Sequence, residues 1–467
     1  MSLSCFDPRF GERMLSVDEA LSVLGESLAS VMRTPRSERV ALAQAPGRVL
    51  AETVISPLDV PAQTNAAMDG IALARASLPD AESGEPLSDH CELSVIGSSL
   101  AGHPWTGRAL AAGEAMRITT GAALPAGADT VVMQEQLEYR SAQGLVDGDA
   151  GERVVIEGVT SIRRGQNVRQ AGEDIARGSQ AMAPGQWLTP AAVGVLASLG
   201  LAEVAVYRPL TVAVFSTGDE VTAPGEMLPA GGIYDANRFS LVALLRDQGI
   251  EVLDLGILGD DEASVSAALR DAATRADMVI TSGGVSVGEA DHVRSALAAC
   301  GELALWRIAM RPGRPLAFGM LRATSADAES SSGQVPFFGL PGNPVATMVT
   351  FLQFVLPALR LLSGQQRLAK AEEGASATAL AQWQAPRLQL IAGETLRSRA
   401  ERVDYHRGQI VLDDRGCQVV MTTGRQGSGI LTSMLLAECL IEIPAGCATL
   451  HAGEPVMVQW LGSRGIV

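Results

Sequence analysis

Lysine is almost absent from this chain of 467 residues. Among its 36 basic residues only Lys370 is a lysine, and the others are arginines. Schiff-base formation, pyridoxal-phosphate chemistry and phosphate binding by a Walker-type lysine therefore have a single candidate residue. Because Lys370 lies in a polar stretch rich in alanine, glutamate and glycine, the sequence argues against all three functions.

Cysteine and histidine are few and scattered. The six cysteines form no CxxC pair, and the five histidines lie far apart along the chain. This pattern argues against a zinc site and against a disulfide framework, and it fits a reducing compartment, so we expect a cytoplasmic protein. His103, His292 and His406 have no ligand or triad spacing, and we interpret them as structural.

Targeting and membrane signals are also missing. The N-terminus includes Asp7, Arg9 and Glu12 and has no apolar segment typical of a signal peptide. No run of 18 apolar residues occurs, which argues against a membrane span. The nearest approach, 191–206, is interrupted by two glycines and Glu203.

Positive charge is in the minority. The chain has 52 acidic and 36 basic residues, a net charge of −16. Such an acidic chain is repelled by nucleic-acid backbones and by anionic membrane surfaces, so we expect neither as a partner. A local basic pocket for a small anion is compatible with this balance.

The apolar content is sufficient for several domains. Apolar residues make up 47% of the chain, and its length predicts three or four domains. A capping box of Ser16 and Glu19 predicts a first helix. Short strands are predicted over 62–164, strands alternating with helices over 210–362, and a small β-barrel or sandwich over 386–467. We therefore predict a multidomain α/β protein with a mostly parallel sheet wrapped by helices.

Three polar motifs follow predicted strands of the α/β region: STGDE at 216–220, GDD at 259–261 and SGGVSVGEAD at 282–291. Ligands of open parallel sheets bind beyond the carboxyl ends of the strands. The glycine-rich third motif, which opens a helix, suits a phosphate, and Glu220, Asp260 and Asp291 supply the hard oxygen ligands that Mg²⁺ needs. Alternatively, the glycines form a structural turn and these acids only cap helices, as Asp260 or Asp261 is placed to do.

Two arginines flank a Pro-Gly turn in RPGRP at 311–315. Arg311 and Arg314 would form a rigid cationic notch for an oxyanion. The alternative is an ordinary turn with solvated arginines. The motif PGNP at 341–344 follows a strand, leads into a helix predicted over 344–362 and places Asn343 at the same rim.

Three further motifs are ordinary turns when they are considered singly. They are NAAMDG at 65–70, which contains Asp69, TTGA at 119–122 and GEDI at 172–175. Ser286 has neither a partner histidine nor a GxSxG context, so nucleophilic catalysis is unsupported.

Together these motifs resemble those of molybdopterin molybdenumtransferases, the family of MoeA and the gephyrin E domain. Seven occur in the family's order: MDG at 68–70, TTGA at 119–122, GED at 172–174, STGDE at 216–220, SGGVSVGEAD at 282–291, RPGRP at 311–315 and GLPGNP at 339–344. QGS at 426–428 and TSM at 432–434 also fit. The resemblance runs from about residue 14 to 463, and the ordered series makes it specific.

The resemblance implies a parallel-sheet molybdopterin-binding domain combined with an elongated domain, a β-rich insertion and a C-terminal β-barrel. The corresponding ranges are an N-terminal helix packing on the sheet domain (1–36), an elongated linking domain (37–60 and 165–206), the insertion (61–164), the α/β domain (207–365) and the barrel (380–467). It also implies a homodimer in which one subunit's sheet domain and its partner's insertion form the site.

The implied reaction inserts molybdenum from molybdate into adenylylated molybdopterin, forms the molybdenum cofactor and releases AMP, with Mg²⁺ as cofactor. Molybdopterin adenylyltransferase and apo-molybdoenzymes are implied as further partners. The family's catalytic positions correspond to Asp69, Thr120, Asp174, Asp219 and Glu220, and its metal ligands to Glu220, Asp260 and Asp291. Its substrate-binding positions correspond to Ser216, Thr217, Gly218, Ser282, Gly283, Gly284, Ser286, Gly288, Pro341, Asn343 and Pro344, and its molybdate-binding positions to Arg311, Arg314, Arg407 and Ser428.

Some positions depart from the family pattern. Arg311 and Arg314 stand where lysine is common, Ala66 replaces a serine, Ile71 a tyrosine, and Glu438-Cys439 an Ala-Asn pair. Arginine is bulkier than lysine and forks, so the oxyanion pose differs. Two alternative functions stay open: a non-catalytic molybdopterin-binding scaffold, and a nucleotide pyrophosphatase of the competence-damage type related to the sheet domain.

Overall fold

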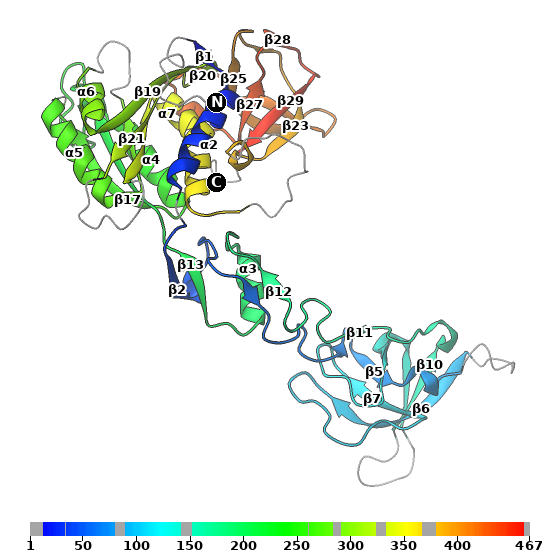
Figure 1. Cartoon of the computed structure of the whole chain (residues 1–467). Coiled ribbons are helices and arrows are strands. Elements are labelled where there is room, and N and C mark those ends of the chain that lie inside the picture. The colour runs from blue at the N-terminus through cyan, green and yellow to red at the C-terminus, as the bar shows by residue number, and fades with distance from the viewer. Residues whose placement is uncertain are drawn as a thin grey trace. The chain divides into compact units, whose positions relative to one another are not determined.

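The computed structural model describes residues 13–32, 34–79, 89–141, 152–259, 261–283, 291–323, 333–366 and 380–461. The chain divides into two compact units, whose elements Figure 1 labels. Unit 1 consists of Met1–Ala51, Gly185–Thr189 and Val204–Val467, and unit 2 of Glu52–Pro184 and Pro190–Glu203.

Unit 1 is built on a seven-stranded sheet with the order β1-β19-β21-β22-β18-β14-β17. The strands are β1 (Met14–Leu15), β14 (Thr211–Thr217), β17 (Glu251–Leu258), β18 (Met278–Ser282), β19 (Gly301–Ile308), β21 (Pro315–Arg322) and β22 (Gln334–Leu340). Neighbours pair in parallel except at β21, which is antiparallel to both β19 and β22. The predicted mostly parallel sheet is confirmed. β21 departs because residues 309–314 are too few for the crossover that a parallel pair needs.

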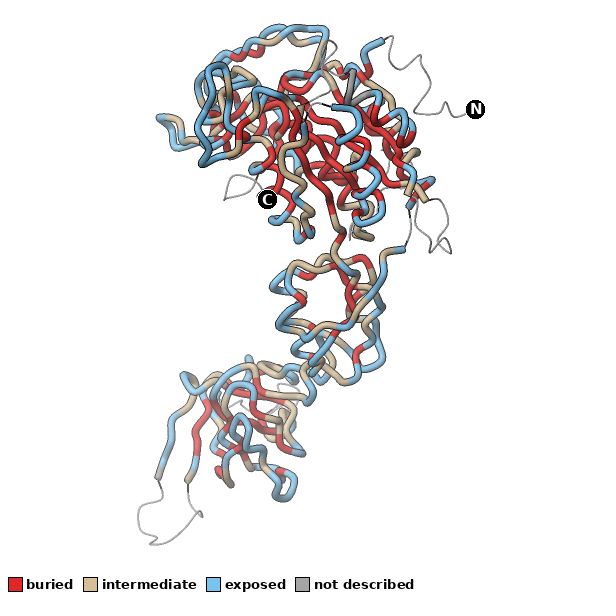
Figure 2. The backbone as a smooth tube through the Cα atoms, turned by 90° about the vertical axis from the view of Figure 1, so that its left-hand side faces the viewer, coloured by how far each residue is buried: buried red, intermediate tan, exposed pale blue. Residues whose placement is uncertain are grey.

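Helices cover both faces of this sheet. They are α2 (Val17–Val31), α4 (Ala236–Asp247), α5 (Glu262–Arg275) and α6 (Asp291–Cys300). Val212 and Val214 of β14 join the core that contains α2 and α4, whereas Ala213 and Phe215 join the core that contains α5 and α6. All four residues are fully buried. Figure 2, which colours the backbone by burial, shows the buried residues in red in the interior of unit 1. Because helices cover the strand side chains on both faces, the carboxyl ends of the strands are the part of the sheet where ligands bind.

The helix predicted over 344–362 contains a wide turn. α7 (Pro344–Thr350) is followed by the π-helical turn η6 (Phe351–Val355) and by α8 (Leu356–Leu362). Pro357 has no N–H to donate to the fourth residue before it, and the wide turn accommodates this loss. Within the described ranges this helix, rather than 191–206, is long and apolar enough to cross a membrane, but 78% of the apolar window is buried inside the protein, as in a core helix.

A closed five-stranded barrel forms the C-terminal part of unit 1. Its strands are β23 (Arg387–Ala392), β25 (Val403–Leu412), β26 (Gln418–Thr422), β27 (Cys439–Ile443) and β29 (Pro455–Trp460). The ring closes because β25 pairs with both β26 and β27. The two-residue strand β20 (Met310–Arg311) pairs in parallel with β25. The predicted C-terminal barrel is therefore present, and it shares hydrogen bonds with the RPGRP segment.

Small elements complete unit 1. Two-stranded pairs are formed by β2 (Ser37–Ala41) with β13 (Glu203–Tyr207), β15 (Val221–Thr222) with β16 (Ile233–Tyr234), and β24 (Leu396–Arg397) with β28 (Thr449–Leu450), and α9 spans Thr432–Leu435.

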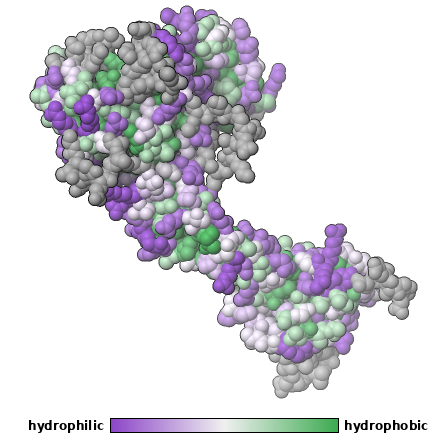
Figure 3. Space-filling model, in the orientation of Figure 1, coloured by the Kyte–Doolittle hydropathy of each residue, from purple (hydrophilic) through white to green (hydrophobic). Residues whose placement is uncertain are grey.

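Unit 2 contains a six-stranded sheet with the order β8-β5-β7-β6-β10-β9. The strands are β5 (Gly70–Leu73), β6 (His90–Ser99), β7 (Glu114–Ile118), β8 (Thr130–Met133), β9 (Leu137–Ser141) and β10 (Glu152–Glu157). The helix α3 (Pro190–Ser198) and the pairs β3 (Val54–Ile55) with β12 (Gln180–Met182) and β4 (Asn65–Ala66) with β11 (Val168–Arg169) complete it. Figure 3 shows hydrophilic residues interspersed with apolar ones on its visible face.

Candidate active site

Three neighbouring parallel strands end at one edge of the unit 1 sheet. β14, β18 and β22 lie side by side, so the motifs that follow Thr217, Ser282 and Leu340 begin at this edge. The Gly283 N–H donates to the Leu340 carbonyl oxygen at 3.2 Å, which joins two of these loops directly. The structure thus brings to one edge the predicted substrate-binding residues that it describes: Ser216, Thr217, Gly218, Ser282, Gly283, Pro341, Asn343 and Pro344.

Two glycines at this edge let neighbouring groups lie close to the backbone. Gly283 has a φ of +91°, and a Cβ there would lie 2.8 Å from the Thr217 carbonyl oxygen. Gly218 has a φ of +133°, and a Cβ there would lie 2.6 Å from Oε2 of Glu220, whose carboxylate folds back over the backbone. At Gly283 both the positive φ and the contact with a backbone oxygen require glycine, whereas at Gly218 the positive φ favours glycine and the Glu220 side chain could move aside.

A buried ionic network, absent from the sequence predictions, supports the same edge. Asp235, directly before α4, accepts hydrogen bonds from Ser216 Oγ at 2.9 Å and from the Arg238 N–H at 3.1 Å. Arg238 donates through Nε to Asp235 at 2.8 Å and through Nη1 to Asp254 at 2.7 Å. Burial lowers the pKa of Arg238, but hydrogen bonds to the two carboxylates outweigh it and raise that pKa. An aspartate followed by arginine three residues later, at the start of a predicted helix, was the available sequence signal.

The predicted carboxylates are described only in part. Asp219 and Glu220 are exposed beyond the end of β14. Asp261 caps α5 by accepting from the Ser264 N–H at 2.8 Å, which confirms the capping interpretation for that residue. Outside the described residues lie Asp260, Gly284, Ser286 and Gly288, together with the side chain of Asp291 at the start of α6. In the part of the chain that is described, no group of three or more His, Cys, Asp or Glu side chains could hold a metal ion.

Arg311 and Arg314 are exposed and flank a turn that is fixed to α7. A Cβ on Gly313, whose φ is +104°, would lie 2.4 Å from Thr350 Oγ1, so the turn packs directly on that helix. Nη2 of Arg314 contacts the Met14 sulfur at 3.2 Å. The two exposed arginines are therefore carried by a rigid base, and the Arg314 guanidinium rests against Met14.

Arg407 of β25 brings a third positive charge to this region. Its side chain is only 1% exposed, and it donates to Ser433 Oγ at 3.0 Å and to the carbonyl oxygens of Tyr405 at 3.2 Å and Gly427 at 3.3 Å. Burial, and then the neighbouring charge of Arg311, lower the pKa of Arg407 to about 10. Arg407 is therefore a cation at neutral pH and lies close to the exposed notch.

The loop around Ser428 connects the arginines to the strand ends. The Ser428 carbonyl oxygen accepts from the Val345 N–H in α7 at 3.0 Å. The preceding Gly427 carbonyl accepts from Arg407. This loop therefore lies between the first turn of α7 and the buried guanidinium.

Asn237, in the first turn of α4, connects the strand ends to one another. Its Nδ2 donates to Ser282 Oγ and to the Gly342 carbonyl oxygen, both at 2.7 Å. A continuous series of hydrogen bonds therefore runs from the end of β18, through Asn237, the PGNP turn and the Ser428 loop, to Arg407 in β25. This strand pairs with β20, which contains Arg311.

Unit 2 brings together two of its three predicted residues. Oδ1 of Asp69 accepts from the Thr120 N–H at 2.6 Å and from Thr120 Oγ1 at 2.8 Å. The backbone hydrogen bond, and then the hydroxyl, lower the pKa of Asp69. The third residue, Asp174, is exposed and donates its backbone N–H to the Val60 carbonyl oxygen at 3.0 Å. Asp174 is thus held by the backbone of a different segment from the one that holds Asp69.

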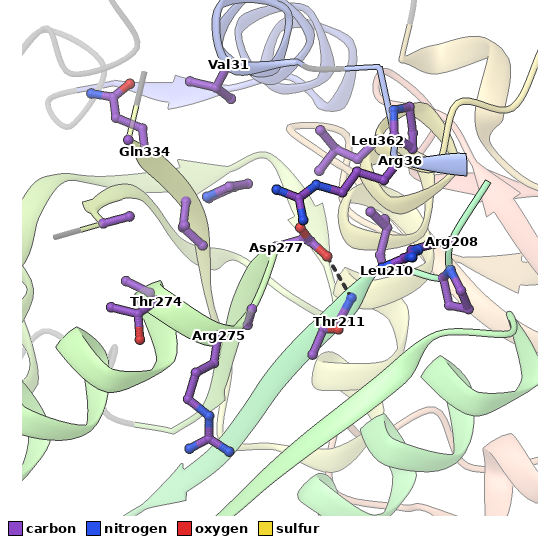
Figure 4. Close-up of a pocket in the computed structure, with 18 of the residues that line it drawn as sticks. Val31, Arg36, Arg208, Leu210, Thr211, Thr274, Arg275, Asp277, Gln334 and Leu362 are labelled. Carbon is purple, nitrogen blue, oxygen red and sulfur yellow. Dashed lines mark hydrogen bonds between the residues drawn. The ribbon is translucent and has the colours of Figure 1, made fainter. Parts of the chain in front are cut away.

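A cavity of about 600 Å³ lies at the opposite edge of the unit 1 sheet (Figure 4). Thr211 begins β14, Asp277 precedes β18 and Gln334 begins β22, and all three line it together with Arg36 and Arg208. Asp277 accepts from the Thr211 N–H at 2.8 Å. Because the predicted site residues follow the other ends of these strands, this cavity is separate from the candidate active site.

Known proteins of one family match nearly the whole chain. Residues 15–200 match the MoeA N-terminal region (domain I and II), residues 213–361 a probable molybdopterin binding domain, and residues 389–461 the MoeA C-terminal region (domain IV). The molybdopterin molybdenumtransferase of Haemophilus influenzae is 38% identical over 450 residues, which are 96% of this chain and 98% of that protein. The chain belongs to the MoeA family.

Further MoeA relatives agree in sequence and in fold. The molybdopterin molybdenumtransferase of a Nostoc species is 32% identical over 449 residues, covering 96% of this chain and 94% of that protein. A crystal structure of a molybdopterin biosynthesis MoeA protein from Pyrococcus horikoshii has a TM-score of 0.65 at 29% identity, and the match covers 96% of this chain and 99% of that one. The predicted fold class, with its α/β sheet domain and C-terminal barrel, is confirmed.

Proposed function

We propose that this protein is a molybdopterin molybdenumtransferase, which inserts molybdenum from molybdate into adenylylated molybdopterin, forms the molybdenum cofactor and releases AMP. Relatives bearing that enzyme name align with 96% of the chain. One substrate of the reaction carries a phosphate anhydride, and the other is a tetrahedral dianion. The site must therefore bind two anions at a fixed spacing.

The observation that carries the proposal is the series of hydrogen bonds from Ser282 to Arg407 of β25, together with the strand pairing that places Arg311 of β20 beside β25. The glycine-rich strand ends suit the phosphates, and the arginines suit molybdate through charge-assisted hydrogen bonds. Because the contacts join the two subsites, we assign most of the catalytic effect to positioning of the two substrates rather than to a single acid or base.

We assign molybdate binding to Arg311, Arg314, Arg407 and Ser428, with different roles. Arg311 and Arg314 are exposed, so an oxyanion can reach them from solvent, and the weak contact of Arg314 with the Met14 sulfur is the one that the anion would replace. Arg407 is almost fully buried and its Nε, Nη1 and Nη2 each donate within the protein. We therefore assign Arg407 mainly to holding the Ser428 loop and adding positive charge.

We propose Mg²⁺ as the cofactor, with Glu220, Asp260 and Asp291 as its ligands. Carboxylate oxygens are the donors that Mg²⁺ prefers, and the exposed Glu220 carboxylate lies beside Gly218 at the end of β14. When bound, the ion would neutralise charge on the substrate phosphates. The loops after β14 and β18 would orient those phosphates through backbone N–H groups.

We further propose a cytoplasmic homodimer in which Asp69, Thr120 and Asp174 of one subunit complete the site of the other. These residues belong to unit 2, whereas the strand ends belong to unit 1. In support, Asp69 and Thr120 form an exposed carboxylate clamp that is already assembled. The proposed partners are molybdopterin adenylyltransferase, as the source of substrate, and apo-molybdoenzymes, as acceptors of the product.

The test is to incubate the full chain with adenylylated molybdopterin, Mg²⁺ and molybdate, and to measure AMP release and reconstitution of an apo-molybdoenzyme. We expect both to require molybdate. AMP release that is independent of molybdate would instead support the pyrophosphatase. Tight pterin binding without turnover would support the scaffold.

Single variants test the assigned residues. Arg314→Ala should raise the molybdate concentration for half-maximal rate by about tenfold, because one charge-assisted hydrogen bond is lost. The matched control is Arg415→Ala, an exposed arginine between β25 and β26, which should leave the molybdate dependence unchanged.

The metal assignment has its own test. Asp291→Asn should abolish AMP release while the dimer persists. Normal turnover by that variant would remove the metal assignment.

A further inference from the structure

We propose that Asn237 is a positioning residue, which fixes the distance between the loop after β18 and the turn after β22. The inference rests on the proposed function, since these loops are assigned there to substrate binding. Asn237 is absent from the sequence predictions. Its proposed effect is exerted through the two loops that its side chain joins.

The contacts of Asn237 are short and link distant parts of the chain. The two N–H groups of its amide donate to Ser282 Oγ and to the Gly342 carbonyl oxygen, each at 2.7 Å, across 45 and 105 sequence positions. An amide offers two donors on one nitrogen, so a single side chain satisfies both acceptors at once. Gly342 is exposed, and a Cβ added there would meet no described atom within 4 Å, so the hydrogen bond from Asn237 restrains Gly342 where packing does not. On either side of Gly342, the Thr347 hydroxyl also holds the turn by donating to the carbonyl oxygens of Pro341 and Asn343.

The start of α4 provides a rigid base for this amide. On one side of Asn237, Asp235 accepts from Ser216 of β14, and on the other side, Arg238 forms ion pairs with Asp235 and with Asp254 of β17. The pair of Arg238 with Asp235 is buried and that with the exposed Asp254 is partly buried, and charge-assisted contacts of this kind hold a backbone segment in one place. The segment Asp235–Arg238 therefore contacts β14, β17, β18 and the turn after β22.

The two loops joined by Asn237 lead to the two proposed subsites. Ser282 and Gly283 begin the glycine-rich phosphate loop, and Gly342 lies two residues before α7, whose Val345 N–H binds the Ser428 carbonyl oxygen. Loss of the amide would leave the backbone hydrogen bond from Gly283 to Leu340 as the remaining described link between these two loops, so their spacing would be less tightly held. Because small displacements of substrate-positioning groups strongly reduce reaction rates, we expect Asn237 to affect binding of adenylylated molybdopterin and turnover with little effect on overall stability.

The test compares Asn237→Ala and Asn237→Asp with wild type and with Arg246→Ala, a control at the exposed far end of α4. In Asn237→Asp the Ser282 hydroxyl can donate to the new carboxylate, but the Gly342 carbonyl oxygen loses its donor. A carboxylate near a helix N-terminus also stabilises the helix. A purely structural role would therefore leave Asn237→Asp active, whereas a positioning role would not.

Two readouts are measured on the full chain. Backbone hydrogen exchange without substrate should become at least about tenfold faster at 282–283 and 340–343 in Asn237→Ala, and stay unchanged in Arg246→Ala. The KM for adenylylated molybdopterin should rise about tenfold or more in Asn237→Ala and Asn237→Asp, because two hydrogen bonds or one are lost. Thermal unfolding of Asn237→Asp should match wild type.

Unchanged exchange at both loops, or a KM within twofold of wild type in both variants, would overturn the inference. If wild type itself lacks molybdate-dependent AMP release, the proposed function fails, but the exchange measurement still decides whether Asn237 restrains the loops.

Discussion

The two units hold an acidic residue at their candidate sites in opposite ways. In unit 1, Asp235 is buried and is held by the Arg238 guanidinium and by Ser216. In unit 2, Asp69 is exposed and is held by the neutral donors of Thr120. Removing one partner of a buried ion pair strongly lowers stability, because the other charge is left without water or a partner. An exposed carboxylate stays accessible to a ligand, and loss of its contacts changes stability little. Unit 1 thus uses its acid as structural support, and unit 2 presents its acid to solvent.

The largest expected effect comes from breaking the buried pair. Arg238→Met leaves Asp235 buried without its cation, so unfolding of unit 1 should be easier by about 3–5 kcal/mol. The matched variant in unit 2 is Arg108→Ala, which breaks the solvent-accessible pair with Glu114 and should change the stability of unit 2 far less. Urea unfolding, followed by hydrogen exchange of peptides from each unit, measures both.

The double variant Asp235→Asn/Arg238→Met provides the control for this comparison. It removes both charges, so part of the lost stability should return. If Arg238→Met is as mild as Arg108→Ala, the buried network does not support the strand ends.

An intermediate effect is expected at two glycines with similar backbone conformations. Gly283→Ala in unit 1 forces a Cβ to within 2.8 Å of the Thr217 carbonyl oxygen at a φ of +91°, and should cost about 2–4 kcal/mol. Gly121→Ala in unit 2 has a φ of +79° but no described atom within 4 Å of the new Cβ, and should cost about 1 kcal/mol. Denaturant unfolding of both variants checks the order. Equal losses would mean that the loops of unit 1 adjust freely to the added methyl group.

The smallest effect concerns the titration of Asp69. Its pKa is lowered by the Thr120 backbone N–H and hydroxyl, so the folded state favours the carboxylate. The resulting stability is fully present above the ordinary pKa of an aspartate, about 4, and is lost as the pH falls through the lowered value in the folded protein. Thr120→Val keeps the backbone N–H but removes the hydroxyl, so the pKa of Asp69 should move part of the way back. NMR titration of the carboxyl carbon measures it, and an unchanged pKa would show that the hydroxyl contributes nothing.

Local patterns predicted much of the fold. Ser16 and Glu19 form the predicted capping box, with Ser16 Oγ accepting from the Glu19 N–H at 3.1 Å and the Glu19 carboxylate accepting from the Ser16 N–H at 2.8 Å. The alternation of strands and helices predicted the sheet, and the turns of residues 386–467 predicted a barrel or sandwich. These features depend on contacts between residues close in sequence or on simple periodicity.

The hydrogen bonds inside the site could not be predicted from local sequence patterns. Asn237 reaches Ser282 and Gly342 across long separations, and nothing near Asn237 in the sequence indicates either partner. Arg407 was predicted as a molybdate-binding residue from the family resemblance, but its burial follows from barrel closure around β25. Motif order identified the residues of the site, and only the packing of distant elements assigns their roles.

The pairing of β20 with β25 has a consequence for recombining this protein with its relatives. Met310 and Arg311 precede the last strands of the α/β sheet in the chain, yet their backbone is aligned with Val403 and Asp404 of the barrel. A chimera that exchanged only residues 380–461 would pair β20 with a β25 strand from another protein. This exchange would shift Arg311, which lies in β20, relative to Arg314. The unit of exchange is therefore the barrel together with the turn at 309–314, which are separated in the gene but adjacent in the folded protein.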